Sequence, residues 1–418
     1  MRLGPEIAVP LDSASGALTV EPAVAMHDSV IVVSWNDSHG GHRERGRHDV
    51  GSAVSLDNGR SFRSLGFLAD SSSTNLPVGG DSRLVSDKHG TFFLELVTNR
   101  SGGDGELHVY ALEPPLYAKW KQLSIVTMGR IVDKPAFIRD AGGRLVLAFM
   151  KDWAIVTASS LDGGRSWTAP LRVSEATLRT RSGSAVVQCG NELWVAWMEG
   201  GGMLLDELWA TRSRDAGRTF EPARMQYALL KTVQPPAGYA LGPGRAGDLG
   251  NDVGLACVPG GGRSAQISMV IVEGAPDRYG RPILSRVLRF DRAVGAAQWS
   301  VPIELTKDDG PAARVFPSVA AERNTFGTLY YEAIADQSHT NVDAVLGLSD
   351  SRGQRSRVKL SEVSTDWLTV KGDNEYSPGQ HNFGDYISLA SDDGRYVAAW
   401  TDGREGRSRI HVRVIEMP

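Results

Sequence analysis

The apolar positions of this chain recur in one order. A strand of small and apolar residues is followed by a turn, and then by an apolar strand that ends in an aromatic and a polar residue. The clear copies begin at Pro22, Pro135, Ser184, Pro317 and Ile387, and weaker copies begin at Asp81 and Asp252. Successive copies start about 50 to 70 residues apart, which indicates a repeated β-unit. The pattern therefore predicts an all-β chain of seven units.

A second repeat follows three of these units. The eight-residue stretches that begin at Ser55, Ser160 and Ser213 all read S-x-D-x-G-x-[ST]-[FW]. Ser and Asp side chains can bond nearby backbone N–H groups, and Gly supplies a positive φ, so each stretch is expected to close a β-hairpin. Three identical turns at the edge of a fold do not make one active site. A structural role is therefore predicted for their aspartates, which are Asp57, Asp162 and Asp215.

These eight-residue stretches closely resemble the Asp box of the sialidase-like β-propellers. The resemblance implies a single propeller domain over residues 1–418, built from four-stranded antiparallel blades. In that family the first strand of each blade is innermost and the box joins the third and fourth strands. The seven units predict seven blades, with six, as in true sialidases, as the alternative.

The two ends of the chain are expected to meet. The last unit ends with a third strand at Ile410–Glu416, while Glu6–Leu11 has the character of a fourth strand. An N-terminal strand that completes the last blade would close the ring and remove its exposed edges.

Composition narrows the functional classes. A hydrophobic fraction of 41% with 22% charged residues supports a sizeable core. The net charge of −4 gives no reason to expect nucleic acid or an anionic membrane as a partner. The N-terminus lacks the apolar region of a signal peptide, which predicts a cytoplasmic protein, or a secreted one if a signal was removed. Cys189 and Cys257 are expected to be two small buried residues rather than a disulfide framework or a zinc site.

In a propeller of this topology, the starts of the inner strands and the loops after the second strands meet at one mouth, which is the default binding site. Carboxylates and arginines gather there and suit a glycan or another small polar ligand. The predicted substrate-binding residues are Glu21, Arg245, Arg281, Arg314, Lys134, Asp402, Arg404, Trp153 and Tyr279. Trp153, Tyr279 and Tyr386 can stack on sugar faces.

One loop of the first unit is rich in histidine. Residues 39–49 contain His39, His42 and His48, and Glu44 or Asp49 could join them as metal ligands. The loop is rich in Gly and Arg and irregular, so nothing in it sets a ligand geometry. Neither a metal site nor a cofactor is predicted.

The resemblance to sialidases gives this loop another interpretation. His39-Gly40-Gly41, Gly46 and Asp49 fall in register with a loop of the sialidase first blade, which places Glu44 in the slot of the family's acid/base Asp. Tyr386, three residues before Leu389, matches the family's nucleophilic Tyr. The candidate catalytic residues are Tyr386, Glu44, Asp385 and Asp37.

One position departs from the sialidase pattern. Glu21 occupies the place of an arginine that binds the sialic acid carboxylate in that family. A carboxylate at this position would repel that group instead of attracting it, a difference of about several kcal/mol at a desolvated site. Arg245, Arg281 and Arg314 could serve as other anion-binding arginines.

Three functions follow from these patterns. The first is a carbohydrate-active protein of the sialidase-like superfamily, a glycoside hydrolase if it is an enzyme, but not a standard sialidase. The second is a noncatalytic propeller that binds a glycan or a protein. The third is a polysaccharide lyase or a small-metabolite enzyme on the same scaffold, since fold alone does not decide function.

Overall fold

The computed structural model describes residues 1–13, 15–16, 18–38, 49–68, 78–99, 104–175, 179–200, 205–229, 253–258, 265–275, 284–334, 341–350, 355–366, 384 and 386–418. All regular elements in these ranges are strands. None of the described residues belongs to a helix with the length and hydropathy of a membrane crossing.

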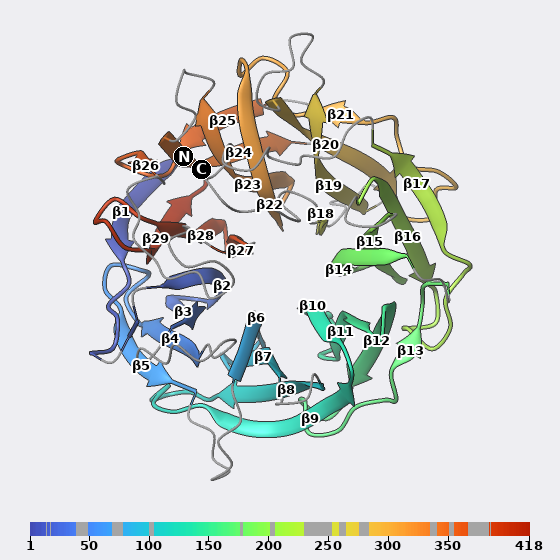
Figure 1. The fold of residues 1–418 in the computed structure, drawn as a ribbon, viewed down its shortest axis with the longest axis horizontal. Coiled ribbons are helices and arrows are strands. Elements are labelled where there is room, and N and C mark those ends of the chain that lie inside the picture. The colour runs from blue at the N-terminus through green and yellow to red at the C-terminus, as the bar shows by residue number, and fades with distance from the viewer. Residues whose placement is uncertain are drawn as a thin grey trace.

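Seven antiparallel sheets form a ring (Figure 1), and residues of all seven line a cavity at its centre, called here the central channel. Six have four strands along one path, and the sheet of β22 has an additional short strand. The seven-bladed prediction is confirmed, and both weaker sequence units, at Asp81 and Asp252, correspond to complete blades.

The strands are ordered from the channel outwards within each blade. The innermost strands are β2 (Thr19–His27), β6 (Val78–Ser86), β10 (Val132–Arg139), β14 (Thr180–Cys189), β18 (Gly254–Val258), β22 (Ala312–Glu322) and β27 (Ser388–Asp392). The second strands are β3 (Val30–Asp37), β7 (Phe92–Asn99), β11 (Leu145–Lys151), β15 (Glu192–Gly200), β19 (Gln266–Ala275), β23 (Thr325–Ile334) and β28 (Arg395–Asp402).

The outer half of each blade is more variable in length. The third strands are β4 (Asp49–Ser55), β8 (Gly105–Leu112), β12 (Ala154–Ser160), β16 (Glu207–Ser213), β20 (Leu284–Ala293), β24 (Asn341–Asp350) and β29 (Arg409–Glu416). The outermost strands are β5 (Arg63–Phe67), β9 (Lys121–Gly129), β13 (Leu171–Arg172), β17 (Arg224–Ala228), β21 (Ile303–Glu304), β25 (Arg355–Lys359) and β1 (Arg2–Ala8). The additional strand β26 (Thr365–Asp366) pairs with β24.

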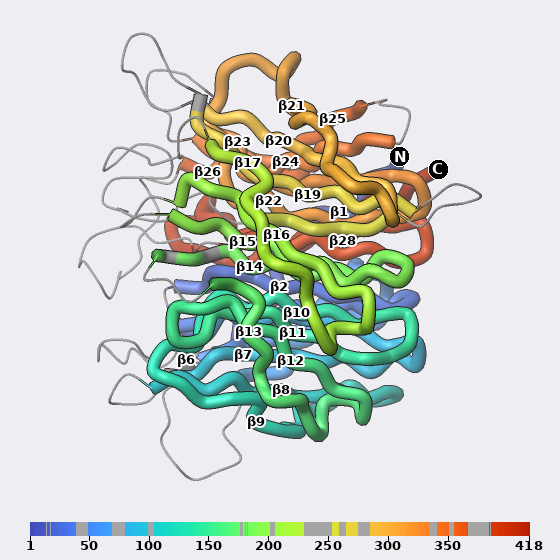
Figure 2. The backbone as a smooth tube through the Cα atoms, turned by 90° about the vertical axis from the view of Figure 1, so that its right-hand side faces the viewer, coloured from blue at the N-terminus to red at the C-terminus, as the bar shows by residue number. Residues whose placement is uncertain are grey.

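The N-terminal strand closes the ring. β1 pairs antiparallel with β29, with Ile7 opposite Val412, so the last blade takes its outermost strand from the start of the chain. The two termini consequently lie side by side in both views (Figure 2). The Glu6 carboxylate accepts a 2.6 Å hydrogen bond from His411 Nδ1 and pairs with Arg404. The predicted closure is confirmed.

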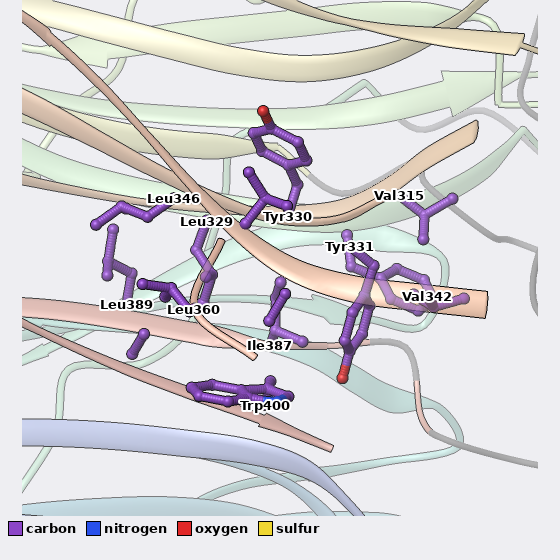
Figure 3. Close-up of a cluster of buried hydrophobic side chains, with 14 of the residues drawn as sticks. Val315, Leu329, Tyr330, Tyr331, Val342, Leu346, Leu360, Ile387, Leu389 and Trp400 are labelled. Atoms are coloured by element: carbon purple, nitrogen blue, oxygen red, sulfur yellow. The ribbon is translucent and has the colours of Figure 1, made fainter. Parts of the chain in front are cut away.

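The core lies between blades. Because both faces of each sheet are covered by a neighbour, second strands such as β15 are buried along their whole length and appear in the sequence as continuous apolar runs. Figure 3 shows one such layer, where residues of blades six and seven pack around Trp400. Among the tryptophans of the second strands, Trp35, Trp197 and Trp400 are each at most 1% exposed.

The repeated eight-residue stretches form tight turns between third and fourth strands. In the first, Ser55 Oγ accepts from the Gly59 N–H at 2.8 Å and donates to Asp57 Oδ1 at 2.8 Å, while Ser61 Oγ donates to Asp57 Oδ2 at 2.6 Å. Gly59 has a φ of 76°. The turns at Ser160 and Ser213 repeat these bonds. The predicted structural role of the turn aspartates agrees with this geometry.

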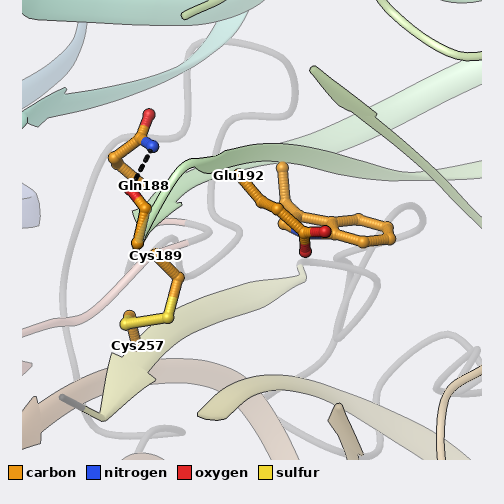
Figure 4. Close-up of a disulfide and its surroundings, with 6 residues drawn as sticks. Gln188, Cys189, Glu192 and Cys257 are labelled. Carbon is orange, nitrogen blue, oxygen red and sulfur yellow. Dashed lines mark hydrogen bonds between the residues drawn. A yellow bond between two sulfur atoms is a disulfide. The ribbon is translucent and has the colours of Figure 1, made fainter. Parts of the chain in front are cut away.

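The expectation for the two cysteines was wrong. Cys189 at the end of β14 and Cys257 in β18 form a disulfide, with Cα atoms 5.5 Å apart (Figure 4). They are 68 residues apart in the chain and meet only because β14 and β18 are first strands of adjacent blades. Their spacing carries no sign of that adjacency.

Candidate functional site

A β-bulge recurs near the start of five inner strands. The strand register shifts there in β2, β6, β10, β14 and β22. At each shift one residue adopts a left-handed backbone: Glu21, Asp81, Lys134, Gly183 and Phe316, with φ between 50° and 62°. Non-glycine residues rarely adopt this conformation, and bulges commonly redirect side chains beside active sites. Each of these five blades thus places a different residue at the equivalent bulge position of its inner strand.

These positions surround the central channel. A cavity of about 240 Å³ lies there and is lined by residues from all seven blades. One lining residue from each blade is Pro22, Arg83, Lys134, Gly183, Gly254, Phe316 and Tyr386. The bulge residues Lys134, Gly183 and Phe316 thus border the channel directly.

Tyr386 is the centre of a polar group on one side of this cavity. Its hydroxyl lies 3.5 Å from Asp81 Oδ2, at the long limit of a hydrogen bond, as is common in catalytic groups without a bound substrate. Arg83 Cζ is 4.0 Å and Lys134 Nζ is 4.5 Å from the centre of the Tyr386 ring. Two positive charges therefore lie where they would stabilise negative charge on the phenol oxygen.

Asp81 also contacts a second carboxyl group, that of Asp133. Burial, the charge of Asp81 and a hydrogen bond with Asp81 raise the pKa of Asp133 to about 8, against the opposing charge of Lys134. The Lys134 N–H donates to Asp133 Oδ1 at 2.7 Å. Two carboxyls in contact cannot both ionise cheaply, so the pair holds one proton near neutral pH. Tyr386, Asp81 and Asp133 form a continuous path for a proton.

A third acid lies behind this group. Glu95 on β7 is the cross-strand partner of Arg83 and is fully buried. Burial raises the pKa of Glu95 well above its usual range, although the charge of Arg83 acts in the opposite direction. Arg83 therefore lies opposite a buried acid in the strand pair and places its guanidinium over the Tyr386 ring.

Glu21 lies beside the same group. Its Oε2 accepts a 2.6 Å hydrogen bond from Asn36 Nδ2, and the side chain is largely buried. Gly384 packs directly on it, since a Cβ at that glycine would lie 2.3 Å from Glu21 Cγ. The segment that leads to Tyr386 is therefore pressed against Glu21, and only glycine permits this approach at a φ of 81°.

Several predicted site residues instead have partners away from this group. Asp37 is fully buried and accepts from the Trp35 indole N–H at 3.0 Å and the Gly16 N–H at 2.8 Å. Asp402 pairs with Arg404 at 2.6 Å in the network that closes the ring.

Two further predicted residues are also held by contacts of their own. Arg314 is buried in a 2.8 Å ion pair with Glu332. Trp153 is 47% exposed, and its backbone carbonyl accepts a hydrogen bond from Arg181.

The remaining predictions fall on other parts of the chain. Glu44, Asp385, Arg245, Arg281 and Tyr279 lie outside the described residues, as does the histidine-rich loop 39–48. Of the predicted set, the structure brings together Tyr386 and Lys134, while Glu21 contacts Gly384, two residues before Tyr386.

Asp133 and Arg83 were not predicted, whereas Asp81, as the start of an inner strand, was expected at the mouth but was given no catalytic or binding role. Its place in the repeat is equivalent to that of Glu21 and Lys134, and this signal could have added it to the candidate residues. Asp133 and Arg83 carry no motif, because they come close to Asp81 and Tyr386 only in the folded ring.

Two groups of described residues combine His with acids at metal-ligand distances. Glu6, Asp402 and His411 form one, but Arg404 already neutralises both carboxylates. His27, Asp28 and Asp392 form the other, at the opposite ends of β2 and β27 from the Tyr386 group. Neither group contacts Tyr386 or Asp133 in the described part of the chain.

Comparisons with known proteins identify the fold. No protein-family model and no curated protein matches the chain. Among solved structures, a polysaccharide lyase matches with a TM-score of 0.54 at 10% identity, over 95% of this chain and 90% of its own. The GH93 α-L-arabinofuranosidase of Fusarium graminearum, in complex with arabinobiose, matches with a TM-score of 0.53 at 15% identity, over 86% and 99%.

A microbial sialidase also matches, with a TM-score of 0.49 at 15% identity, over 83% of this chain and 66% of its own. That score is too low to support kinship. For all three structures, identities this low show a shared fold alone.

Proposed function

We propose that this protein is a glycan-processing enzyme whose active site is the Tyr386 group on the wall of the central channel. The observation that carries the proposal is the contact of the Tyr386 hydroxyl with a carboxyl pair that holds a single proton, Asp81 and Asp133. Perturbed acids that converge on a cavity mark candidate active sites. The fold is also used by an arabinofuranosidase and by a polysaccharide lyase, which supports a glycan as the ligand.

In the hydrolytic version, Tyr386 attacks the anomeric carbon as its hydroxyl proton passes to Asp81. The bond from Tyr386 Oη to that carbon forms, the glycosidic C–O bond breaks, and a carboxylic acid protonates the leaving oxygen. Asp133, neutral near pH 7 because of its raised pKa, is the available acid in the described residues. Water then releases the sugar by the reverse transfer.

A second version is favoured by the arrangement of charge. Arg83 and Lys134 both approach the Tyr386 ring, and the Tyr386 hydroxyl contacts Asp81. With its own proton transferred to Asp81, Tyr386 is a phenolate stabilised by these cations, and it takes the proton next to a uronic acid carboxylate. The electron pair of that C–H bond forms a carbon–carbon double bond, the glycosidic C–O bond breaks, and the leaving oxygen takes the proton of Asp133. This elimination requires only acid and base chemistry on one face of the sugar.

One screen tests the proposal and separates the two versions. The protein is incubated with chromogenic glycosides and with acidic polysaccharides, and both released chromophore and the ultraviolet absorbance of unsaturated products are recorded. Hydrolysis gives the first signal and elimination the second. Tyr386→Phe and Asp81→Asn are expected to abolish whichever signal the wild type shows.

Tyr227→Phe is the matched control, because the Tyr227 hydroxyl also donates to a carboxylate, that of Glu273, but on an outermost strand. Equal activity of Tyr386→Phe and the control would contradict the assignment. Glycan binding without turnover by the wild type would favour the noncatalytic alternative.

The disulfide bears on the compartment. We propose that the protein functions in an oxidising environment, because disulfides such as Cys189–Cys257 persist there and are rare in the cytosol. Thiol labelling of protein taken directly from its native cell tests this, since complete labelling of both cysteines would contradict the proposal.

A further inference from the structure

A second cavity lies at the outer side of blade six. Its volume is about 220 Å³, close to that of the channel cavity, and it shares no lining residue with it. Its walls are the connection from β21 to β22 and the strands β23, β24 and β25 (Figure 1). Drug-sized ligands occupy pockets of about 300–1,000 Å³, so this cavity suits a smaller molecule.

Two consecutive tyrosines on β23, Tyr330 and Tyr331, lie on opposite faces of the blade. Figure 3 shows the rings of Tyr330 and Tyr331 pointing away from each other. Tyr331 faces blade seven, where its hydroxyl donates to the Thr401 carbonyl at 2.8 Å. Tyr330 lines the outer cavity instead, and burial followed by the charge of Asp309 raises its pKa, so it remains a neutral phenol.

A glycine within β24 keeps this cavity open. Gly347 has no positive φ, and a Cβ there would meet Tyr330 Cε1 at 3.7 Å and the Thr328 carbonyl oxygen at 3.8 Å, which are ordinary contacts. By contrast, a Cβ at Gly327 on β23 would lie 2.8 Å from Tyr396 Cε1, so packing excludes a side chain there. Neither backbone nor packing requires glycine at position 347. Glycine inside a strand weakens it and often marks the approach of a ligand.

The charges around the cavity are balanced. Two carboxylates, Asp308 and Asp309, face two guanidinium groups, Arg355 and Arg357, in its lining. Arg357 Nε lies 3.7 Å from Asp309 Oδ2 and the same side chain also pairs with Glu332, so its charge is already compensated. Arg355 donates to the Glu304 carbonyl at 2.7 Å. Such a lining offers hydrogen-bond donors and acceptors to a ligand, but it has no net charge that would attract an ion.

We propose that this outer cavity is a second binding site, for a neutral, hydroxyl-rich molecule about the size of one sugar ring. The ring packs on the Gly347 backbone and the edge of Tyr330, and its hydroxyls exchange hydrogen bonds with Asp309, Arg357 and the Tyr330 phenol. The site is independent of the Tyr386 group. It would hold one sugar unit at the rim of the molecule whatever reaction the channel performs.

Saturation-transfer NMR with single sugars tests the proposal. The probes are D-glucose, D-galactose, L-arabinose and D-xylose, with D-glucuronate and D-glucosamine as charged comparators. Wild-type protein and Tyr386→Phe are expected to bind at least one neutral sugar equally well. Gly347→Val is expected to weaken that binding at least tenfold and Gly347→Ala to weaken it less, in proportion to the volume each fills.

Folding and binding are separable here. Valine favours strands, so Gly347→Val is expected to keep or raise the melting temperature while it loses the sugar. The proposal is overturned if Gly347→Val binds as wild type does, if binding depends on Tyr386 instead, if a charged comparator binds more tightly than every neutral sugar, or if no neutral sugar binds the wild type at the highest concentration reached.

Discussion

Aspartates lie at two repeated features of this propeller, the outer turns and the inner-strand bulges, and their carboxyl groups behave in opposite ways. At the outer turns, hydrogen bonds from Ser61 and from nearby N–H groups lower the pKa of Asp57 to about 2. At the inner bulges, burial and the contact with Asp81 raise the pKa of Asp133 to about 8. The turn repeats both its backbone and its residues, whereas the bulge repeats only its backbone. In this protein, the position where the same residues recur in several blades is structural. The candidate site lies where the backbone conformation recurs but the residues differ between blades.

The largest expected effect is at Tyr386. If the inner position is the active site, Tyr386→Phe removes the group that exchanges a proton with Asp81, and general acid–base catalysis contributes roughly 10²–10⁴-fold to rate. We expect kcat to fall within that range while the melting temperature stays close to wild type. Steady-state kinetics on the substrate found by the glycan screen measure it. A loss confined to KM would indicate a binding role instead.

The proton held by the acid pair gives the second prediction. Asp133→Asn keeps the shape of the side chain but removes its titration, so kcat should fall by about tenfold or more. The limb of the pH–rate profile near pH 8 should also disappear. Profiles of wild type and Asp133→Asn are compared, and a limb that survives the substitution would assign this ionisation to another group.

Stability should respond to pH in opposite directions at the two positions. The native pKa of Asp133 lies above its usual value of 3.8, so its contribution is complete below about pH 4 and is lost as pH rises towards 8. The native pKa of Asp57 lies below 3.8, so its contribution is present above about pH 4 and is lost as pH falls towards 2.

Thermal unfolding across the pH range measures this contrast. Relative to wild type, Asp133→Asn should gain stability as pH rises from about 4 to about 8, whereas Asp57→Asn should differ from wild type least in acid. Parallel curves for the two variants would refute the distinction between the positions.

The smallest effect is expected at the outer turn under neutral conditions. Asp57→Asn weakens side-chain bonds that lie mostly in solvent, so we expect a loss of about 1 kcal/mol in unfolding free energy. Activity should be unchanged, because the turn between β4 and β5 lies away from the channel. Urea denaturation with the activity assay checks both. A lower catalytic rate without a lower unfolding free energy would show that the role of this turn is not purely structural.

Much of the fold could be predicted from the sequence because it depends on short patterns of apolar, turn and glycine residues within each blade. Each blade is a run of strands with its own turns, so seven blades, with six as the alternative, could be predicted from the repeated units. These units begin at Pro22, Asp81, Pro135, Ser184, Asp252, Pro317 and Ile387. The closing strand at Glu6 was also recognisable, because the last unit lacks its fourth strand. Sheets covered on both faces appear as continuous apolar runs, which makes the count robust.

The candidate site was predictable only in part. Tyr386, Lys134 and Glu21 were predicted because each lies at the start of an inner strand, a position that the repeat defines. Asp37 and Asp402 were predicted by a second rule, that the ends of the second strands reach the mouth, yet the structure turns them towards Trp35 and Arg404. The end of a strand is set by the pattern, but the direction of a side chain depends on partners from distant segments.

The sequence by itself determined the architecture: strand order, blade number, ring closure and the structural role of the turn aspartates all follow from contacts within a blade. Only the tertiary structure decided that Tyr386 meets Asp81, that Asp81 contacts Asp133 and that Cys189 bonds Cys257. The physical reason is closure of the ring. It brings residues of different blades within a few ångströms and removes them from water, and no local pattern in the chain encodes those distances.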